Sequence, residues 1–454
     1  MRQLCALFVL LFLTLQGCGE RASTSVTQSH YTYPTFPPEQ LREDLDVLVR
    51  QLDSAHYDLY HAHPKATFDS LHQVLRKGID KPMDAMGFYR HVLPLFDLVK
   101  DAHTLLVFPY DHVRHYAEQG GRFLPVQVEL HEGRAYVKRT LAGDTLPPYA
   151  EITAINGTPM RTIVQDLRML ANHERPWSEE DYMAFLLPRM LNAWYGFDST
   201  WTLRLRTPTV PQDSVTLTGI TLEQLFRPQS PHFTFHDAGE GIGMLDIDRC
   251  ADKDRFAAFC DSVFTVLERD RYQALVIDLR DNGGGSTAHG DTLLTYLTDR
   301  KFTQYPRVSI KYSRLQYPNV DSTHTITYDA DLSRAVDNTK RFTGAVYVLV
   351  NEHTFSSATV LAATIQCYGA GKLVGRETGG TQVFFDEPIV LQLPHTGQRF
   401  LASHQFRWCP CGESKRVGVM PDVAVPWRYE DHRLGTDAEL DVVKRMERER
   451  RGGA

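Results

Sequence analysis

Two short polar segments contain the residue types that peptide-bond chemistry needs. The first, Asn351 to Ser357, lies between the apolar run Ala345–Val350 and the small and apolar residues of Ala358–Tyr368. This pattern predicts a buried strand, a turn and a buried helix. At the start of a helix, free backbone N–H groups and the helix dipole favour developing negative charge. Ser356 or Ser357 is therefore either a nucleophile beside an oxyanion site or an ordinary helix N-cap.

The second segment, Ala274–Ser286, has the sequence ALVIDLRDNGGGS. Its first six residues predict another buried strand, and the three glycines that follow can bring their backbone N–H groups close to a ligand. The segment lacks the lysine and the spacing of a phosphate-binding loop, and it does not match the dinucleotide-binding fingerprint. Asp278 and Arg280 are expected to hold the loop through a charge pair.

Together, the two segments resemble the C-terminal processing (tail-specific) and tricorn-core family of serine peptidases. The resemblance rests on DLRDNGGGS, NEHTFSSA, YGAGKLVGRETGG and, at Gly418–Val425, GVMPDVAV. A weaker likeness extends upstream to about Leu41. The family implies an α/β fold with a crotonase/ClpP-like catalytic domain and peptide-bond hydrolysis through an acyl-enzyme intermediate, without a cofactor.

The resemblance also implies roles for particular residues. Ser356 aligns with the nucleophile of the family. The sequence Asp-Ala-His-Thr matches the family's Asp-x-His-Thr motif, in which the histidine, here His103, is the general base. The oxyanion hole would consist of backbone N–H groups from Gly283, Gly284 and Ser357.

A serine hydroxyl needs a base, and the base needs an orienting group. The tail-specific branch of the family uses a lysine after its Gly-Glu-x-Thr segment, but Thr381 stands at that place here, and Lys372 precedes the segment. The Ser-His-Glu version of the mechanism is therefore expected. Glu413 is the candidate carboxylate, with Asp386 and Glu387 as alternatives.

The chain of 454 residues is long enough for two or three domains, and its 42% apolar and 23% charged residues are typical of globular proteins. A net charge of -7 gives no general attraction for nucleic acid. We expect five segments: a signal peptide (1–17), a tether (18–38), an N-terminal helical domain (39–115), a PDZ-like domain (116–220) and the catalytic domain (221–454).

Apolar residues at helical spacing support the helical domain, and the segment Ala150–Pro159 resembles the strand and turn of a PDZ domain. Tyr149 and Ala150 stand where a glycine is usual in PDZ domains, so a peptide-binding groove and a purely structural role both remain open. The charged segment Asp437–Arg450 predicts a closing helix whose basic end is solvated.

The N-terminus resembles a bacterial lipoprotein signal. Arg2 precedes an apolar run that is too short to span a bilayer, and Leu-Gln-Gly-Cys follows, which makes Cys18 the lipidation site. Several acyl chains would hold the protein at a membrane. Seven cysteines are too few for a disulfide framework in a chain of this length, and the spacing of Cys409 and Cys411 matches no metal site.

The sequence thus predicts a serine endopeptidase that is exported to the bacterial cell envelope, anchored there by lipid, and acts on protein or peptide substrates. The alternative is a catalytically silent lipoprotein of the same architecture that binds peptides or apolar ligands. An intact Ser356 and His103 favour the enzyme. The oligomeric state is left open by the sequence.

Overall fold

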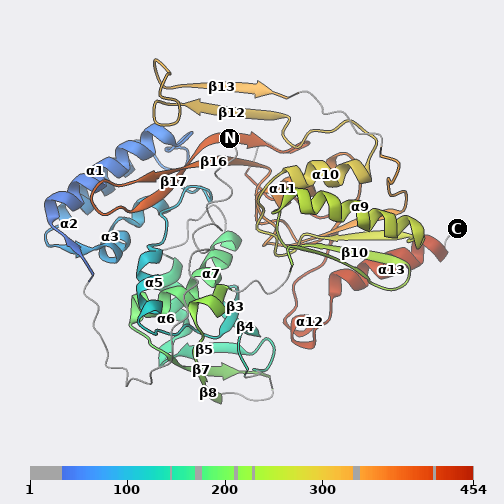
Figure 1. Ribbon diagram of the computed structural model, residues 1–454, viewed down its shortest axis with the longest axis horizontal. Helices are drawn as coiled ribbons and strands as arrows, with labels where there is room; N and C mark the ends of the chain where they lie inside the picture. Colours follow the sequence, from blue (N-terminus) through green and yellow to red (C-terminus); the bar gives the residue numbers. More distant parts are fainter. Residues whose placement is uncertain are drawn as a thin grey trace, which may run out of the picture.

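The computed structural model describes residues 33–143, 146–168, 176–208, 213–226, 231–330, 338–412 and 416–452. The predictions for Cys18 and Glu413 lie outside these residues. The described chain forms a mixed α/β structure with three regions that follow one another in sequence (Figure 1).

The N-terminal region is mostly helical. Its elements are β1 (Thr35–Phe36), α1 (Pro38–Ala55), α2 (Lys65–Gly78), β2 (Met83–Asp84), α3 (Ala85–Val92), α4 (Pro94–Asp97) and α5 (Tyr110–Glu118). In α1, the apolar side chains of Leu41, Leu45, Leu48 and Leu52 recur at helical spacing and are buried, as the sequence predicts.

The middle region is an antiparallel sheet with helices beside it. Its elements are β3 (Val126–His131), β4 (Arg134–Thr140), β5 (Glu151–Ile155), β6 (Thr158–Pro159), α6 (Met160–Arg168), α7 (Pro176–Tyr195), β7 (Thr200–Arg206), β8 (Asp213–Thr218) and α8 (Leu222–Phe226). The strand order is β3-β4-β5-β7-β8, with β6 paired to β5. Strand β3 is therefore an edge strand of this sheet.

The C-terminal region contains two sheets. Its elements are β9 (Phe233–Asp237), β10 (Ile242–Ile247), α9 (Lys253–Arg269), β11 (Ala274–Asp278), α10 (Ala288–Leu297), β12 (Arg307–Tyr312), β13 (His324–Asp329), β14 (Ala345–Val350), α11 (Ser357–Cys367), β15 (Lys372–Gly375), β16 (Val383–Gln392), β17 (Arg399–Trp408), β18 (Val423–Ala424), α12 (Tyr429–Leu434) and α13 (Ala438–Gly452).

The larger of these sheets has the order β18-β15-β14-β11-β10-β9, and all of its strands except β9 are parallel. Helices α9, α10 and α11 cover one face and α13 covers the other (Figure 1). The basic end of α13 is exposed at Arg448, Arg450 and Arg451, as the sequence predicts, but one face of the helix is buried. Val443 and Glu447 on that face are buried, and Glu447 accepts a hydrogen bond from the Tyr347 hydroxyl of β14 at 2.7 Å.

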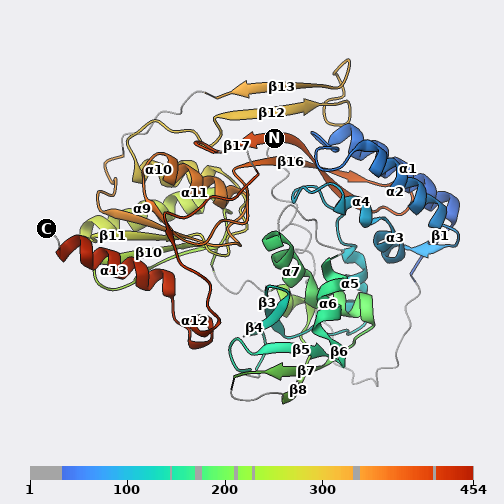
Figure 2. The ribbon, with the colours of Figure 1, turned by 180° about the vertical axis from the view of Figure 1, so that it is seen from behind.

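The second sheet has the order β13-β12-β17-β16, and its long hairpin of β16 and β17 reaches from the catalytic region to the N-terminal helices (Figure 2). One continuous hydrophobic core joins the N-terminal helices and the middle region, and it includes Leu393, Phe400 and Ala402 of this hairpin. The hairpin therefore connects the N-terminal segments to the catalytic region.

Candidate active site

The glycine loop and the serine turn lie at the same edge of the parallel sheet. Strand β11 ends at Asp278 and β14 ends at Val350, and the two strands pair in parallel with Asp278 opposite Leu349. Because the carboxyl ends of parallel strands share one edge, the two polar loops meet there. The sequence predicted both strands and helix α11, and the structure confirms all three elements.

Ser356 occupies the turn between β14 and α11. Its backbone has φ 50° and ψ −123°, a conformation that residues with a side chain rarely adopt. The Ser356 side chain makes no capping hydrogen bond; its Oγ lies 3.2 Å from His103 Nε2. The neighbouring Ser357 hydroxyl donates to the Gly285 carbonyl at 2.7 Å. Of the two serines, Ser356 is thus the one that faces the imidazole.

His103 reaches this turn from the N-terminal region, on a segment that β17 holds in place. Val107 N–H donates to the Arg399 carbonyl at 2.9 Å, and Leu401 N–H donates to the Leu105 carbonyl at 2.8 Å. The imidazole of His103 stacks against the rings of Phe355 and Phe384, with centroid distances of 5.2 and 5.9 Å. Backbone pairing fixes the segment, and aromatic contacts fix the ring plane.

The glycine loop packs against the serine turn but offers fewer free donors than the sequence predicted. Gly284 N–H donates to Asn282 Oδ1 at 2.8 Å, so this N–H is already engaged and the expected role of Gly284 as an oxyanion donor is corrected. A Cβ atom on Gly283 would meet no atom within 4 Å, so open space adjoins that residue. The amide nitrogen of Ser357 lies 2.9 Å from where a Gly284 Cβ atom would be.

Asn282 joins the two loops and was not singled out from the sequence. Its side chain is buried, donates to the Ile247 carbonyl at 2.7 Å and accepts from Gly284, while its own carbonyl accepts from Phe355 N–H at 2.9 Å. An asparagine directly before three glycines was the available signal, because such a side chain often bonds the backbone two residues further on.

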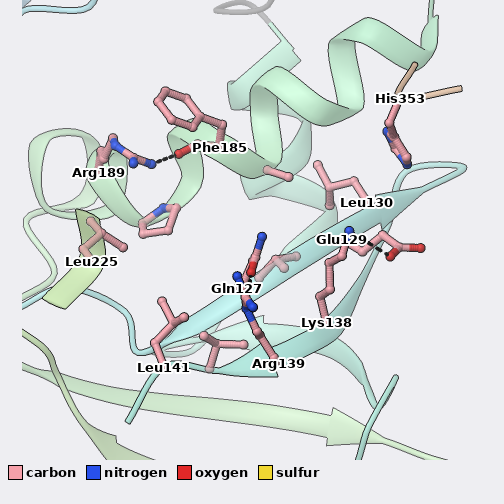
Figure 3. Close-up of a pocket in the computed structure, with 14 residues that line it drawn as sticks. Gln127, Glu129, Leu130, Lys138, Arg139, Leu141, Phe185, Arg189, Leu225 and His353 are labelled. Atoms are coloured by element: carbon pink, nitrogen blue, oxygen red, sulfur yellow. Dashed lines mark hydrogen bonds and ion pairs between the residues drawn. The ribbon is translucent and has the colours of Figure 1, made fainter. Parts of the chain in front are cut away.

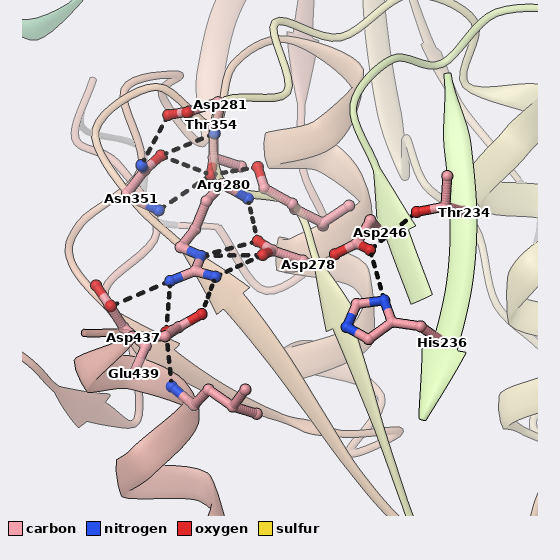
Figure 4. Close-up of polar contacts among 12 residues, drawn as sticks. Thr234, His236, Asp246, Asp278, Arg280, Asp281, Asn351, Thr354, Asp437 and Glu439 are labelled. Atoms are coloured by element: carbon pink, nitrogen blue, oxygen red, sulfur yellow. Dashed lines mark hydrogen bonds and ion pairs between the residues drawn. The ribbon is translucent and has the colours of Figure 1, made fainter. Parts of the chain in front are cut away.

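Charged side chains hold the other side of the glycine loop, as the sequence predicted for Asp278 and Arg280. The Arg280 guanidinium contacts Asp278 at 2.6 Å, Asp437 at 2.8 Å and Glu439 at 3.1 Å (Figure 4). Burial raises the pKa of Asp278 to about 6, although the Arg280 charge opposes this shift. The carboxylates of the loop, of α13 and of the segment before it thus share one buried arginine.

Of the alternatives to Glu413, Asp386 lies near the site. Asp386 Oδ1 is 3.9 Å from His103 Nε2, on the side of the ring that faces Ser356, and its other oxygen pairs with Arg407 at 3.1 Å. Glu387 instead pairs with Arg407 at 2.8 Å and its side chain is about half exposed. Neither carboxylate is therefore seen at the Nδ1 atom of His103.

The lysine alternative is not supported by the position of Lys372. This residue begins β15, opposite Tyr347 of β14, whereas the serine turn follows the other end of β14. Thr381, which stands where the family's lysine is expected, is buried and donates to the Val383 carbonyl at 2.9 Å.

Cys367 and Cys411 form a disulfide with a Cα–Cα distance of 5.6 Å, which the sequence analysis did not anticipate. It joins the end of α11 to the loop after β17. Cys409 is a buried free thiol, and burial raises its pKa to about 12. Within the described ranges, no group of three or more His, Cys, Asp or Glu residues is placed to hold a metal ion. In the same ranges, no helix has the length and apolar character needed to cross a bilayer.

Residues 241–425 match the model of peptidase family S41. The chain carries an S41 peptidase domain. This domain contains the glycine loop and the serine turn. The S41 domain does not include His103, which the N-terminal region supplies.

The chain is 25% identical over 189 residues to the tail-specific protease of Haemophilus influenzae. That match covers 39% of this chain and 24% of the relative, so it spans about a quarter of that protein. Two solved structures share the fold over most of the chain. Mature CPAF has a TM-score of 0.60 at 15% identity and covers 87% of this chain and 94% of its own. Mature CPAF complexed with lactacystin has a TM-score of 0.61 at 16% identity, with coverage of 90% and 98%.

Proposed function

We propose that this protein is a serine endopeptidase in which Ser356 is the nucleophile and His103 is the general base. The observation that carries the proposal is the 3.2 Å distance between Ser356 Oγ and His103 Nε2. The Ser357 hydroxyl instead donates a hydrogen bond to the Gly285 carbonyl. A serine hydroxyl within hydrogen-bond reach of an imidazole is the arrangement that acyl transfer needs.

In the proposed reaction, Ser356 Oγ forms a bond to the substrate carbonyl carbon while its proton passes to His103 Nε2. The N–H groups of Gly283 and Ser357 would stabilise the oxyanion, aided by the start of helix α11. Collapse of this intermediate breaks the C–N bond, and His103 returns the proton to the leaving amine. Water then hydrolyses the acyl-enzyme by the same route in reverse.

Labelling with a fluorophosphonate probe tests the nucleophile. Purified wild-type protein should be modified at Ser356, as mapped by mass spectrometry of peptides, and Ser357→Ala should still be labelled at Ser356. Labelling at Ser357 would overturn the assignment. A wild-type protein that neither takes the probe nor cleaves peptides would instead favour the catalytically silent binder.

A groove beside the edge strand β3 supports binding of extended peptides by the PDZ-like region. The pocket has a volume of about 240 Å³, and Val126–Leu130 of β3, residues of α7 and His353 line it (Figure 3). His353 belongs to the serine turn, three residues before Ser356. A peptide that adds a strand to β3 would therefore extend from the groove towards the nucleophile.

Arg189 lies away from His353 in this groove and is a candidate receptor for a terminal carboxylate. It is only 6% exposed, and its guanidinium stacks on the ring of Phe185 at 3.9 Å (Figure 3). It also stacks on the ring of Phe226 at 4.6 Å. It donates to the Phe185 carbonyl, and its Nε atom has no hydrogen-bond partner among the described residues. A buried guanidinium with an unused N–H donor can form a charge-assisted hydrogen bond with a carboxylate. The substrate class would then be protein tails with a free C-terminus.

Peptide pairs that differ only in a free or amidated C-terminus test this specificity. Wild-type protein should show a KM at least roughly ten-fold lower for the free acid, because one charge-assisted hydrogen bond contributes about 1.5 to 3 kcal/mol. Arg189→Gln should remove the preference, and Arg134→Gln, on the same sheet but paired with Glu151, should keep it. If wild-type protein has equal KM values for the free-acid and the amidated peptide, recognition of a C-terminal carboxylate is contradicted. The assignment of Ser356 is not affected by that result.

We further propose that the protein is exported and anchored by lipid at Cys18, in the bacterial cell envelope. The signal-like N-terminus motivates this, and the Cys367–Cys411 disulfide supports it, because disulfides persist mainly in oxidising compartments. Mass spectrometry of the mature N-terminus should find an acylated Cys18. An unprocessed Met1, or an unmodified Cys18 after cleavage elsewhere, would contradict the proposal.

A further inference from the structure

A buried carboxylate lies on the side of the His103 ring that faces away from Ser356. Asp101 is 0% exposed, and its Oδ1 atom is 4.0 Å from His103 Nδ1. Within the part of the chain that the structure describes, His103 Nδ1 is buried and has no hydrogen-bond partner. The two nitrogens of the imidazole thus face different groups, Nε2 the serine hydroxyl and Nδ1 a buried carboxylate.

Hydrogen bonds hold the carboxylate of Asp101 in place. Its Oδ1 atom accepts from the backbone N–H of His103 at 2.9 Å, and its Oδ2 atom lies 3.2 Å from Nε2 of the buried His56. His56 Nδ1 accepts from Asp58 N–H at 3.1 Å, so the proton of a neutral His56 is on Nε2. A neutral His56 therefore donates a hydrogen bond from Nε2–H to Asp101 and needs no positive charge to do so.

We propose that Asp101 is the positioning carboxylate of this site and that His56 fixes its orientation. The inference rests on the proposed peptidase function. A negative charge about 4 Å from Nδ1, shielded from water, favours the tautomer with the proton on Nδ1. That tautomer leaves the lone pair of Nε2 directed at the Ser356 hydroxyl. The same charge stabilises the imidazolium that forms when His103 accepts the serine proton.

The other charged groups around the ring do not duplicate this position. Asp386 of β16 approaches Nε2 at 3.9 Å and is paired with Arg407 of β17. On the far side of Asp101 lie His56, the ring of His61 stacked on His56, and Arg416 beside His61. Burial alone would raise the pKa of Asp101, but the hydrogen bond from His56 and the electrostatic interactions with His56 and His103 hold it well below its usual range. Asp101 is therefore ionised at neutral pH.

Asp101→Asn tests the proposal, because it removes the charge and keeps one oxygen that can accept from the His103 N–H. Its amide nitrogen replaces the oxygen that accepts from His56. Two readouts are needed: the pH profile of kcat/KM, and titration of the His103 ring by NMR in a Ser356→Ala background. Both midpoints should move to lower pH, because the negative charge that favours the imidazolium is lost. The pH-independent kcat/KM should fall by on the order of 10²-fold.

Asp44→Asn is the matched structural control. Asp44 is also 0% exposed, and it accepts from the backbone N–H groups of His395 and Thr396 at 3.0 and 2.8 Å. This variant should lower Tm yet leave both pH midpoints unchanged. If Asp101→Asn behaves like Asp44→Asn, the role of Asp101 is structural only and the proposal is overturned. Glu413→Gln provides the second comparison, because a larger shift in that variant than in Asp101→Asn would overturn the proposal.

A second variant covers the case in which Asp101→Asn does not fold. His56→Phe keeps a ring against Phe385 but removes the donor to Asp101, and it should lower kcat with little change in KM. Unchanged kcat would overturn the role of His56. The NMR titration needs no enzymatic activity, so it separates the two proposals. If Asp101→Asn lowers the titration midpoint of His103 but the wild-type protein cleaves no peptide, the peptidase function is contradicted and the pairing of Asp101 with His103 stands.

Discussion

A Cβ atom on Gly284 would lie 2.7 Å from the Cβ atom of Ser356. The glycine loop is thus in direct contact with the serine turn. Gly284 also has φ 95°, which strains any other residue. Gly284→Ala should therefore displace Ser356 and lower kcat/KM on the order of 10²-fold or more. Gly369 also has a positive φ, 65°, but a Cβ atom there would meet no atom within 4 Å, so Gly369→Ala is the control that should retain activity. Equal activity of both variants in a peptide-cleavage assay would refute this prediction.

The backbone of Ser356 should make the active site a source of instability. With φ 50° and ψ −123°, Ser356 holds a strained conformation that glycine adopts freely. Ser356→Gly and Ser356→Ala should both abolish probe labelling and peptide cleavage. Ser356→Gly should have a free energy of unfolding higher by about 1 kcal/mol than Ser356→Ala, as measured by urea unfolding. A less stable glycine variant would show that the turn is not strained.

Removal of the candidate base should distinguish the proposed Ser-His mechanism from a Ser-Lys mechanism. His103→Ala should reduce kcat by about 10⁴-fold, because the hydroxyl of Ser356 then has no proton acceptor in reach. Lys372→Ala should leave the rate of peptide cleavage nearly unchanged, since Lys372 pairs with Tyr347 in the middle of β14, whereas the serine turn follows Val350. The reverse pattern would restore a lysine as the base.

The disulfide between Cys367 and Cys411 should stabilise the fold. It closes a loop of 44 residues, for which the chain-entropy estimate is about 4 kcal/mol. A Cys367→Ser, Cys411→Ser double variant should lose up to this amount of unfolding free energy. A reductant should destabilise wild-type protein and leave the double variant unaffected. A double variant that unfolds at the wild-type urea concentration would contradict the prediction.

Acid should weaken the N-terminal region through His112, which stacks on Tyr33 with a centroid distance of 4.2 Å. Burial lowers the pKa of His112 from 6.5 to about 4. Between these values the unfolded chain binds a proton that the folded chain does not. This contribution to stability is therefore present above pH 6.5 and is lost as the pH falls towards about 4. His112→Gln should lose less unfolding free energy than wild-type protein between about pH 7 and pH 4.5.

Much of the catalytic region could be predicted from the sequence because its signals are local. Strands β11 and β14 are continuous apolar runs, and helix α11 consists of small and apolar residues. Such local patterns by themselves predict buried elements. Ser356 and His103 were selected by resemblance to a family motif. Their 3.2 Å contact spans 253 positions, and no local pattern contains it.

Only the tertiary structure decided the surroundings of these residues. The Asn282 side chain occupies the Gly284 N–H, His56 anchors Asp101, Cys411 pairs with Cys367, and Val443 of the charged C-terminal helix is buried. Each of these facts depends on which distant segments the hairpin of β16 and β17 and the two sheets bring into contact. A sequence pattern shows what a residue can do. Which hydrogen bond it makes depends on the partners that folding places within about 3 Å of it.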